Sequence, residues 1–315
     1  MLLHSRFDPQ EIEKERRVII EEINMSKDSP AQQVNMLIDD LLWPKHPLGR
    51  DIAGSKKSVT AITRETMLHH LQGQYLPHNT VAAIAGNIGH QEARDAVSQT
   101  MGDWTNPQPH RGYSAYEPKQ ERRVHIEKRD SEQTHLCLAL PGLPLLHPQR
   151  FTLDLLNIIL GEGMSSRLFT EIRDKLGLAY SIHSYVEHFL DSGSITIYAG
   201  TEPKNLETVT KAILEQLQLL KEIVPASELS KAKELAKGRL ILRMENSLNV
   251  ATWMGGQEIL VGRILSVDQV ISIIDAITAE ELEQLARELI VSEQLRLAVV
   301  GPISKDKPLE QLLKL

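Results

Sequence analysis

Cysteine is almost absent from this chain, since Cys137 is the only one among 315 residues. A single thiol excludes an internal disulfide and a zinc site built from cysteines. Cys137 lies in an apolar run, and the sequence suggests no catalytic partner for it. We therefore expect a small core residue rather than a catalytic thiol.

Aromatic residues and positive charge are also scarce. Aromatics make up 4% of the chain, so few side chains could stack on bases, and the formal net charge of -7 does not favour binding to phosphates. Nucleic acid is therefore not an expected partner. No apolar run approaches the ~20 residues of a membrane span. The first six residues lack the charged and apolar regions of a signal peptide, and we expect a cytoplasmic protein.

What the chain does contain is enough apolar residues, 41% of the total, for one or two packed domains. Their spacing predicts a mixture of helices and strands. The expected helices are 9–25, 29–42, 63–75, 90–101, 149–160, 166–175, 205–223, 226–245, 267–274 and 279–289. The expected strands are 80–88, 124–126, 134–140, 179–186, 192–199 and 295–300.

An internal repeat is the most informative feature of this pattern. Ile62 opens a predicted helix, and the strand after it ends at Gly86, 24 residues later. Ile277 opens a second such unit, which ends at Gly301 after the same 24 residues, and the two units are offset by 215 positions. Two similar α+β domains explain this spacing better than a chance match between common helix–strand units.

The repeat also predicts the domain limits. Residues 105–120 are rich in proline and show no periodicity, so the linker is placed at 109–120 and a second domain at 121–315. The counterpart of the start of this second domain would lie about ninety residues ahead of Met1. Residues 1–108 are therefore expected to be the C-terminal part of an incomplete first domain, which cannot bury a sheet face by itself.

Two glutamates in the first predicted helix are candidates for chemistry. Glu15 and Glu22 are seven positions apart, which is close to two helical turns, and therefore share a face with Ile19. Acidic groups beside apolar ones are costly unless they are paired or bind a cation. Spacing alone favours the simpler alternative, a solvated face with basic residues nearby.

The run from Glu15 to Met25, followed by 28–30 (Asp-Ser-Pro), resembles the helix after the zinc motif in M16 metallopeptidases, the insulinase, pitrilysin and mitochondrial-processing-peptidase family. In that family the distal glutamate completes a His/His/Glu zinc site, and Glu22 matches it. Glu15 matches an acidic residue that supports the site without binding the metal. The implied fold is a clamshell of the M16/LuxS-like metallohydrolase type, in which each of two similar domains is a mostly antiparallel sheet covered by helices.

The motif that supplies the other two zinc ligands and the general base in that family, His-x-x-Glu-His, does not occur in this sequence. The nearest approach, His183 with Glu187 and His188, has one residue too many and lies in a predicted strand. Because side chains alternate along a strand, the two histidines are expected on opposite faces. Zn²⁺ is thus implied as a cofactor, but its site is incomplete in this chain.

A second candidate is Arg173 with Tyr180, seven positions later. This run, with Gly161 and Gly163 marking a flexible break ahead of it, resembles the signature of the family's second domain, where the Arg and Tyr contact the bound peptide. Arg can pair with a carbonyl or carboxylate, and a tyrosine hydroxyl can donate to a developing oxyanion. The alternative is a surface Arg that ends a helix and a Tyr that starts a strand.

The repeat maps Glu22 onto Lys237, as expected if only the first of two duplicated domains holds the metal. Two functions follow. The first is an M16-type zinc endopeptidase that acts on peptides and is inactive as this isolated chain. The second is a non-catalytic M16-like subunit that binds peptides or scaffolds an active partner. The resemblance also implies a homodimer or a heterodimer with another M16 chain.

Overall fold

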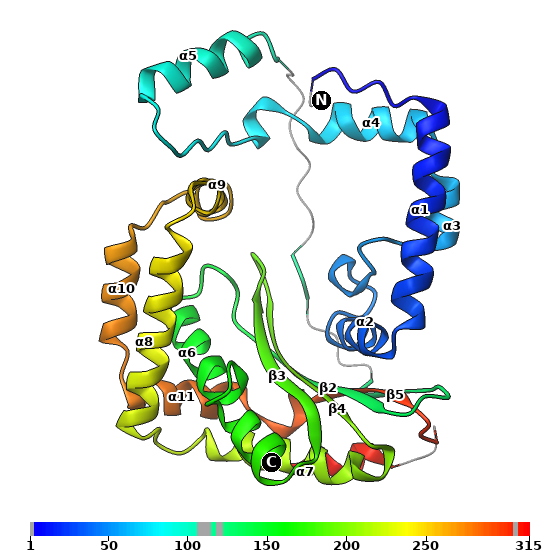
Figure 1. Cartoon of the computed structure of the whole chain (residues 1–315), viewed down its shortest axis with the longest axis vertical. Coiled ribbons are helices and arrows are strands. Elements are labelled where there is room, and N and C mark those ends of the chain that lie inside the picture. The colour runs from blue at the N-terminus through cyan, green and yellow to red at the C-terminus, as the bar shows by residue number, and fades with distance from the viewer. Residues whose placement is uncertain (1–2, 106–114, 118–121, 305–307) are drawn as a thin grey trace. The chain divides into compact units, whose positions relative to one another are not determined.

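A computed structural model describes residues 3–105, 115–117, 122–304 and 308–315 (Figure 1). By its backbone contacts the chain divides into two compact units. Unit 1 comprises 1–24, 53–114 and 238–269, and unit 2 comprises 25–52, 115–237 and 270–315. Most of the expected linker falls outside the described residues, and the domain limits at 108 and 121 remain a prediction.

Unit 2 is built on one five-stranded sheet in the order β1-β5-β2-β4-β3. The β1–β5 pair is parallel and the other pairs are antiparallel, which confirms the mostly antiparallel sheet expected for the second domain. The strands are β1 (Val124–Lys128), β2 (Thr134–Pro141), β3 (Ala179–His188), β4 (Gly193–Thr201) and β5 (Arg296–Gly301).

Helices cover both faces of this sheet (Figure 1). The helix α2 (Pro30–Leu42) packs on β2 and β5, while α6 (Arg150–Gly161) packs on β3 from the opposite face. The remaining helices described wholly or mostly within unit 2 are α7 (Leu206–Leu219), α8 (Ala226–Arg243), α10 (Val267–Ala276) and α11 (Ala279–Leu289). A sheet covered on both faces requires strands that are apolar throughout, and every residue of β5 is buried.

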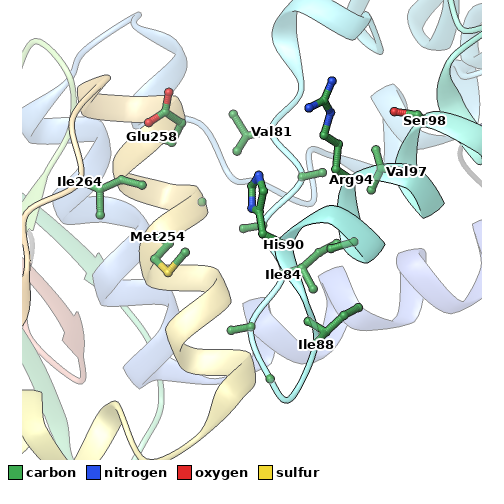
Figure 2. Close-up of a pocket in the computed structure, with 16 residues that line it drawn as sticks. Val81, Ile84, Ile88, His90, Arg94, Val97, Ser98, Met254, Glu258 and Ile264 are labelled. Carbon is green, nitrogen blue, oxygen red and sulfur yellow. The ribbon is translucent and has the colours of Figure 1, made fainter.

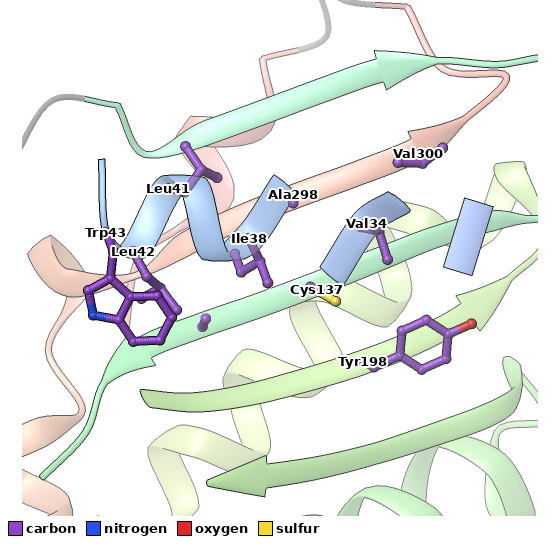
Figure 3. Close-up of a cluster of buried hydrophobic side chains, with 10 residues drawn as sticks. Val34, Ile38, Leu41, Leu42, Trp43, Cys137, Tyr198, Ala298 and Val300 are labelled. Atoms are coloured by element: carbon purple, nitrogen blue, oxygen red, sulfur yellow. The ribbon is translucent and has the colours of Figure 1, made fainter. Parts of the chain in front are cut away.

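The interface between α2 and the sheet shows how the pattern specifies this packing (Figure 3). Val34 and Ile38 are four positions apart, so both lie on the helix face that packs against Cys137 of β2 and Ala298 of β5. Cys137 is fully buried, which confirms the expected core residue. Burial raises the pKa of its thiol well above the usual range, so it is poorly suited to nucleophilic chemistry.

Unit 1 consists of helices and irregular segments, and its described part holds no strand. It contains most of α1 (Pro9–Asp28), then α3 (Lys56–Ala61), α4 (Arg64–Gln74), α5 (His90–Met101) and α9 (Ser247–Val261). Arg16 ties α1 to the end of α3 by donating to the carbonyl oxygens of Val59 and Ile62. Ile23 is the buried anchor of α1.

The helical elements of the two repeats agree closely at the offset of 215 positions. The helix α4 matches α11, and the 3₁₀ turn Pro77–Asn79 matches Ser292–Gln294, residue for residue. Thr63 and Thr278 cap the two helices alike, each accepting a hydrogen bond from the N–H three residues on. The residues that end the two helices have nearly the same backbone angles. A duplicated unit accounts for all of these matches.

Two expectations about local structure are wrong, and one helix was not expected. Residues 80–88 form no strand, because no other strand lies in the described part of unit 1 to pair with them. The expected α-helix at 166–175 is largely a π-helix, Phe169–Lys175. The helix α9 was not expected, since its apolar residues surround the whole helix and Gly255-Gly256 resembles a helix break. In the described part of the chain, no helix has the length and apolar content needed to cross a bilayer.

Candidate functional site

Arg173 and Tyr180 are brought together by an irregular connection between helix and strand. The π-helix Phe169–Lys175 widens its turns, so that the N–H of Leu176 donates to the carbonyl of Glu171 at 3.1 Å. Gly177, with φ of +61°, then reverses the chain into β3. The buried side chain of Ile172 fixes this element to unit 2.

Tyr180 occupies a β-bulge. In the β3–β4 ladder Ala179 pairs with Thr201, but Ser181 pairs with Gly200, so Tyr180 is the extra residue without an opposite partner. A bulge turns one side chain out of the regular alternation and is common beside functional sites. Tyr180 is 78% exposed, whereas both Ala179 and Thr201 beside it are buried. The bulge therefore presents the phenol to solvent.

The guanidinium of Arg173 lies between two aromatic rings. Its Cζ is 4.7 Å from the ring centre of Phe169 and 4.9 Å from that of Tyr180. Such stacking holds a guanidinium in place through its face and leaves the N–H groups at its edge available for hydrogen bonds. An exposed phenol and a fixed guanidinium can together bind the carbonyls or the carboxylate of a peptide. Phe169 was not singled out from the sequence, although its position four residues before Arg173 is a usual helical contact spacing.

Glu15 and Glu22 lie on α1 in unit 1, and both carboxylates are exposed. Val18, which is between them in sequence, is exposed as well. Among the described residues none forms a hydrogen bond or an ion pair with either carboxylate, although other glutamates of the helix do pair, such as Glu13 with Arg16. The structure thus places the two glutamates on open surface, and Arg173 with Tyr180 on unit 2.

The residues present do not by themselves fit a zinc site. Within the described ranges no group of three or more His, Cys, Asp or Glu side chains is arranged to hold a metal ion. His188 is engaged elsewhere, because its Nδ1 contacts the carbonyl of Leu143 at 2.6 Å and its Nε2 contacts Asp154 at 3.1 Å. Lys237, the counterpart of Glu22, pairs with Asp275 at 2.8 Å, so the second repeat has a cation at this position.

A group of polar residues between α2 and the sheet was not anticipated. The side-chain oxygen of Asn35 accepts hydrogen bonds from the Tyr185 hydroxyl at 2.9 Å and from Cys137 at 3.5 Å. Burial, together with the charge of Glu187, raises the pKa of Asp39 to about 7. The polar side chains of this group are partly buried. In the sequence, Asn35 and Asp39 look like the solvent side of an amphipathic helix.

Comparison with known proteins identifies a matching family model and relatives that are similar in sequence. A family model described as the peptidase M16 inactive domain matches residues 61–235, which include Arg173 and Tyr180. A Bacillus subtilis protein called an uncharacterized zinc protease is 34% identical over 307 residues, 96% of this chain and 73% of that protein. A Mycobacterium leprae protein of the same description is 33% identical over 327 residues, which are 100% of this chain and 72% of its own.

Solved structures resemble the fold. A crystal structure of a peptidase M16 inactive domain from Pseudomonas fluorescens matches with a TM-score of 0.87 and 20% identity, over 97% of this chain and 73% of that one. A protease from Helicobacter pylori matches with a TM-score of 0.86 and 21% identity, over 94% and 73%. A chain of complex III from Candida albicans matches with a TM-score of 0.80 and 18% identity, over 96% and 75%.

Proposed function

The chain belongs to the peptidase M16 family, and we propose that it forms the peptide-binding part of a zinc-dependent endopeptidase and donates one ligand to its metal. The two remaining zinc ligands and the general base come from a polypeptide segment that carries His-x-x-Glu-His. By itself the chain binds peptides and does not cleave them. Curated relatives described as zinc proteases support this assignment.

The contact between Arg173 and Tyr180 on unit 2 is the main support for this proposal. An ordinary surface Arg and a Tyr that merely starts a strand would need neither the stacking of the guanidinium nor the bulge that exposes the phenol. Tyr180 also stands near the start of β3, which is the last strand of the sheet. A short extended peptide can add to such an edge through main-chain hydrogen bonds, with Arg173 and Tyr180 binding its carbonyl oxygens.

Glu22 is the proposed zinc ligand, and Glu15, two turns earlier, supports it. Three protein ligands and a water are usual at catalytic zinc, and Glu22 is an unpaired carboxylate on a long helix. An exposed apolar side chain, Val18, shares this stretch of α1. We take the exposed stretch as the surface that the His-x-x-Glu-His segment covers. When bound there, zinc would supply an activated water at neutral pH.

The second candidate is a non-catalytic M16-like subunit that binds peptides or scaffolds a partner. It is favoured by the lack of a metal-binding group in the described residues and by the inactive-domain description of the matching family model. Such a subunit would pair with another M16 chain, as a homodimer or a heterodimer. In that case the Arg173–Tyr180 pair would still bind peptide, but Glu22 would have no metal to bind.

Reconstitution separates the two functions. The chain is co-expressed with an M16 segment that carries His-x-x-Glu-His, and cleavage of a short unstructured fluorogenic peptide is followed. We expect cleavage by the combination, none by the chain alone, and a loss of at least ~100-fold in kcat for Glu22→Gln, since a metal ligand is removed. Glu21→Gln is the matched control, because its exposed carboxylate lies about 100° around the same helix. Equal activity of both variants would remove Glu22 from the site.

A further inference from the structure

One face of the sheet in unit 2 carries a row of ring side chains on β3 and β4. Tyr198 of β4 lies directly opposite His183 of β3 in the ladder. The centres of the two rings are 5.2 Å apart, with 34° between their planes. Tyr185 is two positions along β3 and therefore on the same face, and its ring centre is 6.3 Å from that of His183, at 33°. His183 is thus the ring that contacts both tyrosines.

The neighbours of this row show which side of the sheet it occupies. Tyr198 belongs to the buried cluster beneath α2 (Figure 3). Ser184, the next residue of β3, faces α6 instead, because its hydroxyl donates to the side-chain oxygen of Asn157 at 2.7 Å. Side chains alternate along a strand, so His183 points away from α6. Since α2 packs on β2 and β5, and β4 separates these strands from β3, the side chain of His183 is exposed.

The polar atoms of the two tyrosines already have partners, but those of His183 do not. The Tyr185 hydroxyl donates to Asn35 at 2.9 Å, and the Tyr198 hydroxyl is 2.7 Å from Nδ1 of His135. Within the described ranges the ring nitrogens of His183 form no hydrogen bond. Partial desolvation lowers the pKa of His183 below its usual 6.5, so its ring is uncharged at pH 7. This face therefore offers a ligand ring surface and a neutral imidazole, which suit an aromatic side chain.

The position of His183 on β3 brings it next to an added strand. Because β3 is the last strand of the sheet, a peptide that adds to it places one side chain directly beside His183, with ~4.5–5.5 Å between the Cβ atoms. The residue two positions along the peptide lies on the same face, beside Tyr185. Glu187, the next residue of β3 on this face, contributes negative charge, which disfavours an acidic side chain there.

We propose that His183 determines the side-chain specificity of peptide binding by unit 2, because its ring receives an aromatic side chain of a peptide strand added along β3. A second aromatic residue, two positions away in the peptide, lies against Tyr185. The ligand is thus an extended peptide with one aromatic residue, or with two in alternate positions. This inference rests on the proposed function, in which the peptide adds to β3 beside Arg173 and Tyr180.

Unit 1 offers a competing site for an apolar or aromatic side chain. An open depression of about 670 Å³ is lined by apolar side chains, among them Ile84 and Met254, and His90 also lines it (Figure 2). His90 is exposed, as His183 is, but in the described structure no aromatic ring contacts it. His90 is therefore a matched control for His183, because it is an exposed histidine beside apolar side chains without a row of rings.

The test measures the affinity of the full chain for short unstructured peptides by fluorescence anisotropy. The peptides consist of Ser, Gly and Thr with one central Phe or, as the apolar control, one central Leu. We expect the Phe peptide to bind about fivefold more tightly than the Leu peptide, because ring contacts add to the burial of apolar surface. His183→Ala should reduce this ratio to about one. His183→Phe, which restores a ring, and His90→Ala should both keep it.

Arg173→Ala separates this inference from the proposed function. It should weaken the binding of both peptides without changing their ratio. If the wild-type chain binds neither peptide, the proposed function is contradicted and this inference fails with it. If the chain binds both equally well, or if His90→Ala rather than His183→Ala removes the preference for Phe, peptide binding stands and the assignment of His183 is wrong.

Two isomeric peptides test the strand geometry. Both contain two Phe residues, which occupy alternate positions in one peptide and adjacent positions in the other. Alternate residues of a strand share a face and lie against His183 and Tyr185, whereas adjacent residues point to opposite faces. We expect the alternate isomer to bind at least ~threefold more tightly. Equal affinities would show that the peptide does not bind as a strand along this face, and would overturn the inference.

Discussion

The ring of Tyr180 lies over the guanidinium of Arg173, with 4.9 Å between its centre and Cζ, and Tyr180 is the unpaired residue of the β3 bulge. The two residues are seven positions apart in sequence. Arg173 belongs to the π-helix Phe169–Lys175, Gly177 follows that helix, and Tyr180 is the bulge residue. Each of these irregular features has a cost that regular structure avoids. Their combination around one Arg–Tyr pair is the strongest structural indication of a binding site in the described chain.

Arg173→Ala is expected to weaken peptide binding by about tenfold, because it removes a charge-assisted contact of about 1.5 kcal/mol. Arg173→Lys should restore little of the loss, since an ammonium neither stacks between Phe169 and Tyr180 nor offers paired N–H groups. The measurement is the fluorescence anisotropy of a labelled unstructured peptide titrated with the chain.

Lys175→Ala is the control for this series. Lys175 lies two positions further along the same π-helix, and its exposed ammonium pairs with Glu171. It carries the same charge as Arg173 but stacks on neither ring, so peptide affinity should be unchanged. An equal loss in the two alanine variants would mean that net charge, and not the stacked guanidinium, governs binding.

Gly161→Ala should destabilise the protein by about 1–3 kcal/mol, because overpacking a tight contact forces the backbone to move. Gly161 ends α6, and a Cβ there would lie 2.6 Å from the backbone nitrogen of Ser184 in β3. Gly238→Ala in α8, where nothing lies within 4 Å, should instead be neutral or stabilising by up to about 1 kcal/mol. The free energies of unfolding of both variants are compared by urea denaturation. Equal values would refute the close contact at Gly161.

The partly buried carboxyl group of Asp39 predicts that the free energy of unfolding falls as pH rises. Its pKa in the folded protein is about 7, above the usual 3.8. Burial is the larger cause of this increase, and the charge of Glu187 is the smaller one. The folded protein therefore holds this proton more tightly than the unfolded chain, and the advantage disappears as pH rises toward 7. Between pH 5.5 and pH 8 the group should reduce the free energy of unfolding by about 2 kcal/mol.

Asp39→Asn isolates this effect, since an amide does not titrate. His188, whose pKa is also shifted, contributes equally to both proteins, so the difference between their stability–pH curves reports Asp39. Urea denaturation at the two pH values should show a steeper fall in the wild type than in the variant. Parallel curves would place the titration of Asp39 outside this range.

Sequence reasoning identified the sheet of unit 2 and most helices because their signals are local. The 3.6-residue spacing of Val34, Ile38 and Leu41 and the cap at Thr278 are sufficient to define α2 and the start of α11. Whether an apolar run becomes a strand depends on partner strands from elsewhere, which its own sequence does not show. The runs Val81–Gly86 and Arg296–Gly301 are both strand-like, but in the described structure only the second has neighbours to pair with.

The residues of the candidate site remain a prediction, and the geometry around them was not predictable from the sequence. Arg173 and Tyr180 are recognisable as a pair by family resemblance, yet the stacking on Phe169 and the bulge depend on the register between β3 and β4, which no short pattern encodes. Asp39 was missed for a related reason. Its burial comes from packing of α2 on a sheet that lies more than ninety positions away in the chain.

Zinc content decides whether Glu22 belongs to a metal site. The purified chain and its complex with a His-x-x-Glu-His segment are dialysed against the same trace of zinc, and bound metal is measured by mass spectrometry. We expect the complex to hold about one zinc per chain, and the chain alone and the Glu22→Gln complex to hold almost none, because three protein ligands are needed. Stoichiometric zinc in the Glu22→Gln complex, or none in the wild-type complex, would show that Glu22 is not a zinc ligand.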